Sequence, residues 1–255
     1  MKSKEIRQKL AEGEVTYGTW MQIPHPAVAE ILSASGFEWV AIDLEHGQVS
    51  PGLLPDLFRA IELSGACPFA RVARNHPKDI KQALDAGAKG IIVPMVETKE
   101  DANNMIIWSQ YPPDGKRGVG FSRANVFGLN FPEYSNLINK EIVMVAQIEH
   151  INAVKNLKDI LSTGRLDAIM IGPYDLSGSM GLTGKFEHPD FLKVISTILA
   201  ETKRQNVACG FHIIHPNEDS IGKVVSDGYR FIALGTDAVY LWSSATDTMQ
   251  KAKKK

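Results

Sequence analysis

The sequence predicts one α/β domain of the (β/α)8 barrel class, covering residues 1–255, and three observations support this. A length of 255 residues suits a single barrel, since such barrels reach ~250 residues without dividing into domains. Eight short apolar runs alternate with segments of helical character. The runs lack the polar alternation of strands with one solvent face, which favours a closed parallel barrel covered by helices. The predicted strands are Tyr17–Ile23, Trp39–Leu44, Pro68–Val72, Gly90–Val96, Ile142–Ile148, Ala168–Ile171, Val207–Ile214 and Arg230–Leu234.

The segments between these strands carry helix and loop signals. Residues Ala27–Ser35 and Pro77–Ala86 have the apolar spacing of helices, and a glycine follows each. The segment Tyr111–Gly120 is rich in proline and glycine, so we expect a surface loop at the same end of the barrel as the site. A dinucleotide-binding sheet is disfavoured, because Gly118-Val119-Gly120 follows this loop and lacks the third glycine.

The composition narrows the possible partners and the compartment. A net charge of -1 gives no electrostatic case for binding nucleic acid or an anionic membrane, so we expect a small-molecule partner. Cys67 and Cys209 are far apart and flanked by small or apolar residues, as expected for buried thiols in a reducing compartment. The chain begins without the apolar centre of a signal peptide and contains no apolar run of membrane-spanning length. We therefore expect a cytoplasmic protein.

Two neighbouring predicted strands end in acids, Glu149 and Asp175. The carboxyl ends of barrel strands form the face where barrel enzymes hold their active sites. Two carboxylates with open coordination positions suit Mg²⁺ or Mn²⁺ together with water and an oxygen-bearing substrate, whereas Zn²⁺ prefers more nitrogen or sulfur. The alternative is that each acid caps a following helix or pairs with an arginine.

A histidine and an arginine lie at the same predicted rim. His46 follows the second strand, and its near-neutral pKa makes it a candidate base, with a plain surface histidine as the alternative. Arg71 ends the third strand, where a buried guanidinium requires an anionic partner. It either stabilises an enolate or forms an internal ion pair with Asp43 or Glu45. Schiff-base chemistry is disfavoured, because no predicted strand ends in a lysine.

Six short motifs stand in order along the chain. They are Asp43-Leu44-Glu45-His46, Val93-Pro94-Met95-Val96, Tyr111-Pro112-Pro113, Arg117-Gly118-Val119-Gly120, Gln147-Ile148-Glu149 and Gly172-Pro173-Tyr174-Asp175-Leu176-Ser177. Together they resemble the HpcH/HpaI family of class II pyruvate aldolases, of the type that acts on 2-keto-3-deoxy acids. The resemblance runs from about residue 18 to residue 237, and its ordered motifs make it specific.

The resemblance implies a reversible, divalent-metal-dependent aldol reaction of pyruvate with an aldehyde, with Mg²⁺, Mn²⁺ or Co²⁺ as cofactor. Glu149 and Asp175 would bind the metal, His46 would move the proton, and Arg71 would steady the enolate oxygen. The pyruvate would be held by Gln147 and by the main chain around Gly172, Pro173, Tyr174 and Asp175.

The resemblance also implies a homo-oligomer, in the family a hexamer built as a trimer of dimers. The acid that partners the catalytic histidine matches Asp85, at the end of a predicted helix. Within one chain this position should lie away from the rim, so the pairing with His46 would need a neighbouring subunit. The alternative is that Asp85 is an ordinary acid at a helix end.

The chain departs from the family pattern where the aldehyde would bind. After the glycine of the seventh strand it has Phe211-His212-Ile213-Ile214-His215, where members of the family usually carry small or aliphatic residues. With Arg74 and Arg123, His212 suggests a polar or anionic aldehyde, because these side chains donate to hydroxyls and carboxylates. His212 is equally well explained as a packed residue at the end of its strand.

The preferred hypothesis is a carbon–carbon lyase that cleaves a 4-hydroxy-2-oxo acid to pyruvate and a polar aldehyde. Two alternatives remain. One is a citramalyl- or malyl-CoA lyase, which shares the acidic metal site, and the other is a non-catalytic barrel that binds a carboxylate.

Overall fold

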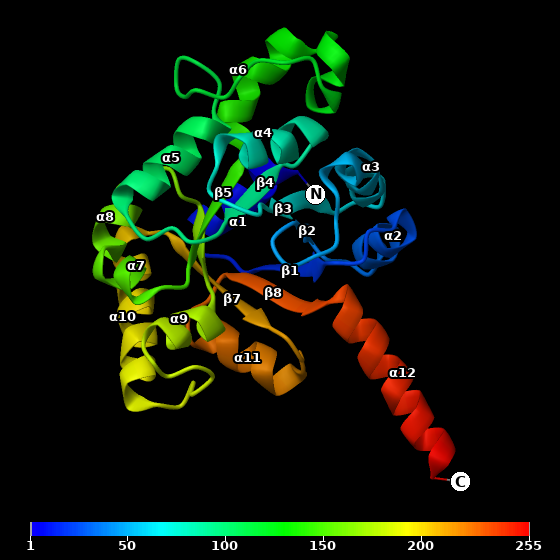
Figure 1. The fold of residues 1–255 in the computed structure, drawn as a ribbon, viewed down its shortest axis with the longest axis vertical. Coiled ribbons are helices and arrows are strands. Elements are labelled where there is room, and N and C mark those ends of the chain that lie inside the picture. Colours follow the sequence, from blue (N-terminus) through cyan, green and yellow to red (C-terminus); the bar gives the residue numbers. More distant parts are fainter. Residues whose placement is uncertain (1, 255) are drawn as a thin grey trace.

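Eight parallel strands close into a barrel in the computed structural model, which describes residues 2–254 (Figure 1). Each strand pairs with its neighbour in chain order, and β8 returns to pair with β1. The predicted barrel is therefore confirmed, with strand boundaries within three residues of the predicted ones. The strands are β1 (Thr16–Met21), β2 (Trp39–Asp43), β3 (Cys67–Arg71), β4 (Gly90–Val93), β5 (Val143–Ile148), β6 (Ala168–Ile171), β7 (Ala208–Ile213) and β8 (Phe231–Thr236).

Helices alternate with the strands and cover the outside of the barrel (Figure 1). The predicted helices correspond to α2 and α4, and α4 has the predicted bounds. The α-helices are α1 (Ser3–Ala11), α2 (Pro26–Ala34), α3 (Leu54–Leu63), α4 (Pro77–Ala86), α5 (Lys99–Ser109), α6 (Phe131–Glu141), α7 (Ile151–Lys155), α8 (Leu157–Leu161), α9 (Pro173–Ser179), α10 (Pro189–Gln205), α11 (Glu218–Ser226) and α12 (Asp237–Lys253). Two short 3₁₀ helices are η1 (Pro51–Leu53) and η2 (Arg123–Gly128).

Aromatic rings fill the interior of the barrel. The Trp39 and Phe231 rings stack with their centroids 4.2 Å apart. Gly18 leaves room for this stack, because a Cβ at residue 18 would come within 1.9 Å of the Trp39 ring. Helix α1 adds Ile6 and Leu10 to the same buried cluster. The packed interior supports the strands, whose carboxyl ends then form the floor of the site.

The proline- and glycine-rich segment 111–120 lies at the amino end of the barrel, which corrects the expectation that it opens beside the site. It follows α5, which leads from the carboxyl end of β4 back toward the amino end of β5. The segment continues through η2 and α6 into β5. Because it is inserted after a helix and not after a strand, it opens from the end of the barrel opposite to the strand carboxyl ends.

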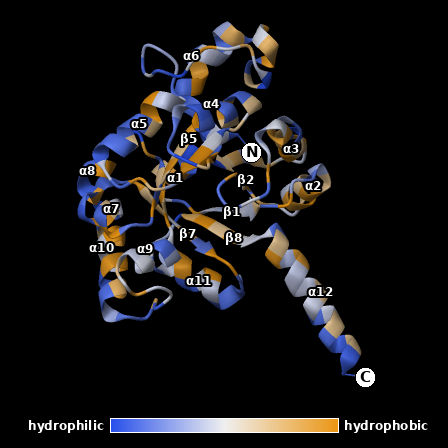
Figure 2. Ribbon diagram, in the orientation of Figure 1, coloured by the Kyte–Doolittle hydropathy of each residue, from blue (hydrophilic) through white to orange (hydrophobic). Residues whose placement is uncertain are grey.

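Helix α12 projects away from the barrel (Figure 1). Its Leu241 and Trp242 side chains are 66% and 61% exposed. Apolar residues are spread along α12 among polar ones, whereas the barrel strands form the apolar centre of the molecule (Figure 2). Among the described residues, no helix combines the length and apolar character needed to cross a membrane.

Candidate active site

A cavity of about 260 Å³ opens at the carboxyl ends of the strands. Most of the predicted site residues line it, which agrees with the position of active sites in barrel enzymes. The lining residues are Trp20, Gln22, Asp43, His46, Arg71, Gln147, Met170, Ile171, Gly172, Pro173, Tyr174, Asp175, His212 and Thr236.

Arg71 and Asp43 form a buried ion pair at adjacent strand ends. Arg71 Nε donates to Asp43 Oδ1 (2.9 Å), and its Nη2 donates to Oδ2 (2.6 Å). Gln22 Nε2 also donates to Oδ2 (2.9 Å), and the backbone N–H groups of Glu45 and His46 donate to Oδ1. Burial raises the pKa of Asp43, but the hydrogen bonds and charge of Arg71 outweigh this effect, so the pKa lies below its ordinary 3.8. The internal ion pair considered as an alternative for Arg71 is therefore present, and it fixes the guanidinium at the cavity.

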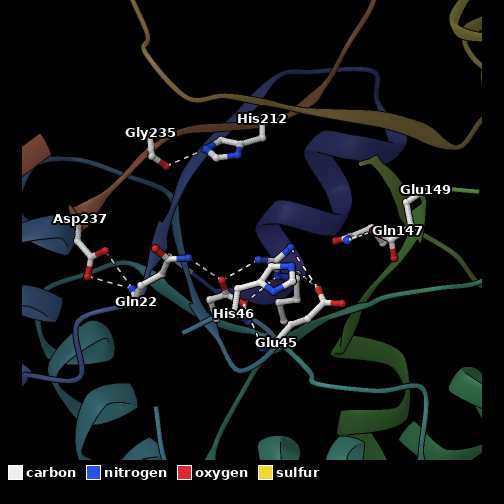
Figure 3. A network of polar contacts seen from close by, with 10 residues as sticks. Gln22, Glu45, His46, Gln147, Glu149, His212, Gly235 and Asp237 are labelled. Carbon is white, nitrogen blue, oxygen red and sulfur yellow. Dashed lines mark hydrogen bonds and ion pairs between the residues drawn. The ribbon is translucent and has the colours of Figure 1, made fainter. Parts of the chain in front are cut away.

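Glu45 and His46 extend this polar network (Figure 3). Glu45 Oε2 lies 3.3 Å from Arg71 Nη1 and 3.9 Å from His46 Nε2. Burial raises the pKa of Glu45 above its ordinary value, and the charge of Glu149 contributes, against the opposing effect of Arg71. The His46 side chain is 64% exposed, so its imidazole is accessible for proton exchange.

Glu149 is buried without a charged partner. Its residue exposure is 3%, and it forms no ion pair with any residue from 2 to 254. Oε1 accepts a hydrogen bond from the Met95 backbone N–H (2.7 Å), and Oε2 accepts one from Gln147 Nε2 (2.5 Å; Figure 3). Both donors are neutral. A buried carboxylate is costly without a compensating charge, so this position favours a bound cation.

The backbone around Glu149 is shaped to fit its side chain. A Cβ at Gly172 would lie 2.8 Å from the Glu149 Cβ and 2.9 Å from its Oε2, so glycine is needed for this close approach. Met95 has a φ of 53°, in the left-handed region that a non-glycine residue rarely adopts. This conformation accompanies the hydrogen bond from its N–H to Glu149. Strained backbone of this kind occurs most often at functional sites.

Asp175 lies in the first turn of α9, which begins at Pro173 directly after Gly172. Its side chain is exposed. Asp175 lines the cavity together with Gly172, Pro173 and Tyr174. Glu149 is not one of the lining residues; it lies behind them, against Gly172 and in a hydrogen bond with Gln147. One predicted metal ligand therefore lines the cavity, and the other lies directly behind Gly172 in its wall.

The donor set of these two acids fits a hard divalent cation. Across residues 2–254, no three His, Cys, Asp or Glu side chains gather into a complete metal cage. Mg²⁺ and similar ions do not require one, because they keep several water or substrate oxygens and bind one or two protein carboxylates. The carboxylates of Glu149 and Asp175 are oxygen donors of the type that such ions prefer.

His212, at the end of β7, lies on another wall of the cavity (Figure 3). Its Nε2 is 3.1 Å from the Gly235 carbonyl oxygen, and its ring meets the Trp20 indole edge to face with centroids 6.0 Å apart. The Arg71 guanidinium carbon lies 4.6 Å from the centre of the same indole. Burial, helped by the charge of Arg71 and only partly opposed by the Gly235 carbonyl, lowers the pKa of His212 to about 4. The imidazole is therefore neutral at pH 7.

Asp85 lies at the end of α4, away from the cavity of its own chain. Arg117 Nη2 donates to its Oδ1 (2.7 Å), and the Arg117 side chain is fully buried. The guanidinium also stacks on Tyr111, with its carbon 4.5 Å from the ring centre. A pairing of Asp85 with His46 does not form within one chain, so it stays a prediction about a neighbouring subunit.

Two arginines predicted to bind substrate do not line the cavity of their own chain. Arg74 is 71% exposed and pairs with Asp79 (2.9 Å), because it lies beyond the strand and turns toward α4. Arg123 pairs with Glu62 and donates to the Ala86 carbonyl oxygen (3.0 Å), since η2 belongs to the insertion at the amino end of the barrel. The structure corrects the expectation that either arginine serves this chain's own cavity.

Trp20, Gln22, Met95 and Thr236 contribute to the site but are not among the predicted site residues. Gln22 directly follows β1 and Thr236 ends β8, so their strand-end positions were a usable signal. Met95 follows the end of β4 within a motif noted above, but its left-handed backbone, which is not typical of methionine, could not be read from the sequence.

Known proteins resemble this chain over almost its whole length. The model of the HpcH/HpaI aldolase/citrate lyase family matches residues 16–243. A 4-hydroxy-2-oxovalerate aldolase from Novosphingobium aromaticivorans is 36% identical over 248 residues, which cover 96% of this chain and 93% of that protein. A 5-keto-4-deoxy-D-glucarate aldolase from Salmonella arizonae is 37% identical over 234 residues, covering 91% of this chain and 90% of that protein.

A solved structure supports the same assignment. The crystal structure of an HpcH/HpaI aldolase/citrate lyase family protein from Burkholderia cenocepacia J2315 superposes with a TM-score of 0.92 at 30% identity. The match covers 98% of this chain and 99% of the other. This chain therefore belongs to the HpcH/HpaI aldolase/citrate lyase family and is a carbon–carbon lyase of the aldolase type, as its motifs predicted.

Proposed function

We propose that the protein is a divalent-metal-dependent aldolase that reversibly cleaves a 4-hydroxy-2-oxo acid to pyruvate and an aldehyde. The observation that carries this proposal is the Glu149 carboxylate, which is 3% exposed and lacks a basic partner among residues 2–254. It lies against Gly172 and Gln147, which line the cavity together with Asp175. The aldolases named above, which carry 2-oxo or keto-deoxy acids in their names, support the same substrate class.

Glu149 and Asp175 are the residues that would hold the cation, which is Mg²⁺, Mn²⁺ or Co²⁺ in this proposal. When bound, a divalent cation supplies the positive charge that stabilises an enolate oxygen. Glu149 is held for this role by the Met95 N–H and the Gln147 amide. Hydrogen bonds to a carboxylate of this kind hold it in the orientation in which it binds a metal ion.

The other residues bind the keto acid and move its proton. The start of α9 after Gly172 presents main-chain N–H groups toward the pyruvate carboxylate, with Gln147 beside it. His46 takes a proton from the pyruvate methyl group in the direction of condensation and returns it in cleavage. The electron pair of that C–H bond forms the double bond between the methyl carbon and the keto carbon, and the carbonyl π pair moves to the keto oxygen, where the guanidinium of Arg71 stabilises the developing charge. Asp43 holds this guanidinium in place.

We further propose a homo-oligomer, a hexamer built as a trimer of dimers, in which Asp85 of a neighbouring chain orients His46. The position of Asp85 away from its own cavity and the exposed Leu241 and Trp242 on the projecting α12 support contacts between copies. The free, buried thiols of Cys67 and Cys209 support a reducing, cytoplasmic location. Light scattering during size-exclusion chromatography tests the oligomer, and a monodisperse active monomer would contradict it.

Pyruvate release from a panel of 4-hydroxy-2-oxo acids tests the proposed reaction. We expect EDTA to abolish activity and added Mg²⁺, Mn²⁺ or Co²⁺ to restore it. Activity that persists in metal-free protein, or substrate trapping by borohydride, would contradict the proposal. Cleavage of malyl-CoA or citramalyl-CoA without pyruvate aldol activity would favour the CoA-thioester lyase instead, and an inactive metal-loaded protein would favour a binding barrel.

A further inference from the structure

One wall of the cavity has no part in the chemistry proposed above. It is formed by Trp20, Gln22, His212 and Thr236, and we call these four residues the acceptor wall. Trp20 lies in β1 and Gln22 directly follows it, His212 lies in β7, and Thr236 ends β8. The residues proposed to hold the metal and the pyruvate carboxylate lie instead at the ends of β5 and β6 and at the start of α9. If pyruvate occupies the latter side, as the proposed function requires, the aldehyde must lie against the acceptor wall.

The acceptor wall carries no cation for an anionic aldehyde. Arg71 is the only basic side chain other than the histidines among the described residues that line the cavity. Its guanidinium is already held by Asp43 and lies 3.3 Å from Glu45. The arginines that suggested an anionic substrate, Arg74 and Arg123, are paired elsewhere in the chain.

His212 instead offers a neutral hydrogen-bond acceptor. Its Nε2 lies 3.1 Å from the Gly235 carbonyl oxygen, which only accepts, so Nε2 must carry the proton of a neutral ring. Nδ1 is then the acceptor, and it has no hydrogen-bond partner within residues 2–254. Trp20 fixes the plane of the ring through its edge-to-face contact. Because the ring is fixed in place at the cavity wall, a ligand hydroxyl group can donate a hydrogen bond to His212 Nδ1.

We propose that His212 Nδ1 accepts a hydrogen bond from a hydroxyl group of the aldehyde, and that this contact makes the enzyme selective for uncharged hydroxyaldehydes. An aldehyde without a hydroxyl leaves the acceptor unpaired and loses the contact. Binding of an aldehyde that carries a carboxylate is disfavoured, because the carboxylate oxygens and His212 Nδ1 are all hydrogen-bond acceptors. His212 is therefore a specificity-determining residue and takes no part in moving the proton of pyruvate.

Glycolaldehyde and acetaldehyde provide the matched pair of substrates, since they differ by one hydroxyl group. The measurement is kcat/KM for condensation of each aldehyde with pyruvate in the Mn²⁺-loaded enzyme. In His212→Leu we expect the glycolaldehyde-to-acetaldehyde ratio of kcat/KM to fall about 10-fold, which corresponds to the net contribution of one hydrogen bond. His212→Asn should retain part of the preference, because its amide oxygen still accepts. His215→Leu is the matched control, since His215 is exposed and does not line the cavity.

Three results would overturn the proposal. The first is an unchanged ratio in His212→Leu, and the second is the same fall in His215→Leu. The third is a wild-type preference for succinic semialdehyde over glycolaldehyde, which would indicate a cation at the acceptor wall. Thermal unfolding of each variant confirms that the fold is intact before the ratios are compared.

Exchange of the pyruvate methyl protons in D₂O, measured without an aldehyde, separates this proposal from the proposed function. Wild-type enzyme that does not exchange these protons would contradict the proposed function itself. If wild type exchanges them, we expect His212→Leu to exchange at the same rate within about 2-fold, because the acceptor wall acts only on the aldehyde. A large loss of exchange in His212→Leu would show that the residue serves enolate formation and overturn the specificity role.

Discussion

Asp43 and Glu149 are both buried carboxylates at strand carboxyl ends, but their charges are balanced in different ways. Asp43 has no exposed side-chain surface and forms two hydrogen bonds with the Arg71 guanidinium. Glu149 is 3% exposed and accepts from one backbone N–H and one amide, both neutral. The chain thus provides a basic side chain as the partner of Asp43. Among the described residues, it provides none for Glu149.

This difference separates a structural acid from a ligand-binding acid. Hydrogen bonds from neutral donors give a buried carboxylate partners for its oxygens. They offset only part of the free-energy cost of removing its charge from water. The pair formed by Asp43 and Arg71 needs nothing further. Glu149 gains most from an added cation, and the close approach of Gly172 keeps its carboxylate beside the cavity.

Glu149→Gln should give the largest effect. The fold is retained, because glutamine can still accept from the Met95 N–H, and the variant removes an uncompensated buried charge. We expect the melting temperature to stay the same or rise, and Mn²⁺-dependent aldolase activity to fall by ~10³-fold or more with the loss of metal binding. Calorimetric titration with Mn²⁺ checks the binding, and unchanged Mn²⁺ affinity would contradict the assignment of Glu149 as a cation-binding acid.

His46→Ala tests whether the acid-base group lies on the Arg71 side of the cavity. We expect exchange of pyruvate methyl protons into D₂O to slow by ~10²-fold or more, the scale of general-base catalysis, while Mn²⁺ still binds. Stability should change little, since the side chain is 64% exposed. His215→Ala is the control, and an unchanged exchange rate in His46→Ala would remove the residue from this role.

Asp43→Asn should mainly affect folding, because it leaves the Arg71 guanidinium, which is 13% exposed, without its principal partner. We expect the free energy of unfolding at pH 7 to fall by about 3 kcal/mol, measured by urea denaturation. Asp79→Asn is the matched control, since it removes the partner of the 71% exposed Arg74. In the control the free energy of unfolding should fall far less, because exposed ion pairs contribute little to stability. Equal losses in the two variants would contradict the structural role of Asp43.

Gly172→Ala sharpens the assignment of Glu149, because the added Cβ would meet the Glu149 side chain at 2.8 Å. The carboxylate must shift, so we expect Mn²⁺ affinity to weaken by ~10-fold, as when an outer-shell contact is lost. Gly178→Ala, within α9, is the control, since its Cβ would meet Thr183 Oγ1 at an ordinary 3.5 Å. Equal Mn²⁺ affinities in the two variants would show that the approach of Gly172 is not needed.

The smallest expected effect is a difference in acid sensitivity. The folded-state pKa of Asp43 lies below its ordinary 3.8, so its stabilising contribution is present above about pH 4 and is lost as the pH falls through the folded-state value. The difference in stability between wild type and Asp43→Asn should therefore shrink between pH 5 and pH 3. Urea denaturation over this range measures it, and a constant difference would mean that Arg71 does not set the charge state of Asp43.

The candidate site was predictable from sequence wherever it depends on strand ends. In a parallel barrel, the last residues of each strand reach the same face, so the positions of Glu149, Arg71 and His212 follow from the apolar runs before them. Arg123 shows the limit of this reasoning. Its segment follows a helix, and only the path of the chain reveals that it opens from the other end of the barrel.

The barrel, the family and the residue types at the rim could all be predicted from the sequence, because strand periodicity and ordered motifs are local properties of the chain. Which charged side chains pair with one another became clear only from the folded chain. It paired Arg71 with Asp43, left Glu149 with neutral donors, and placed the His212 ring between Trp20 and the Gly235 carbonyl. Charge compensation depends on burial and on distances between strands, and neither is a property of a single segment.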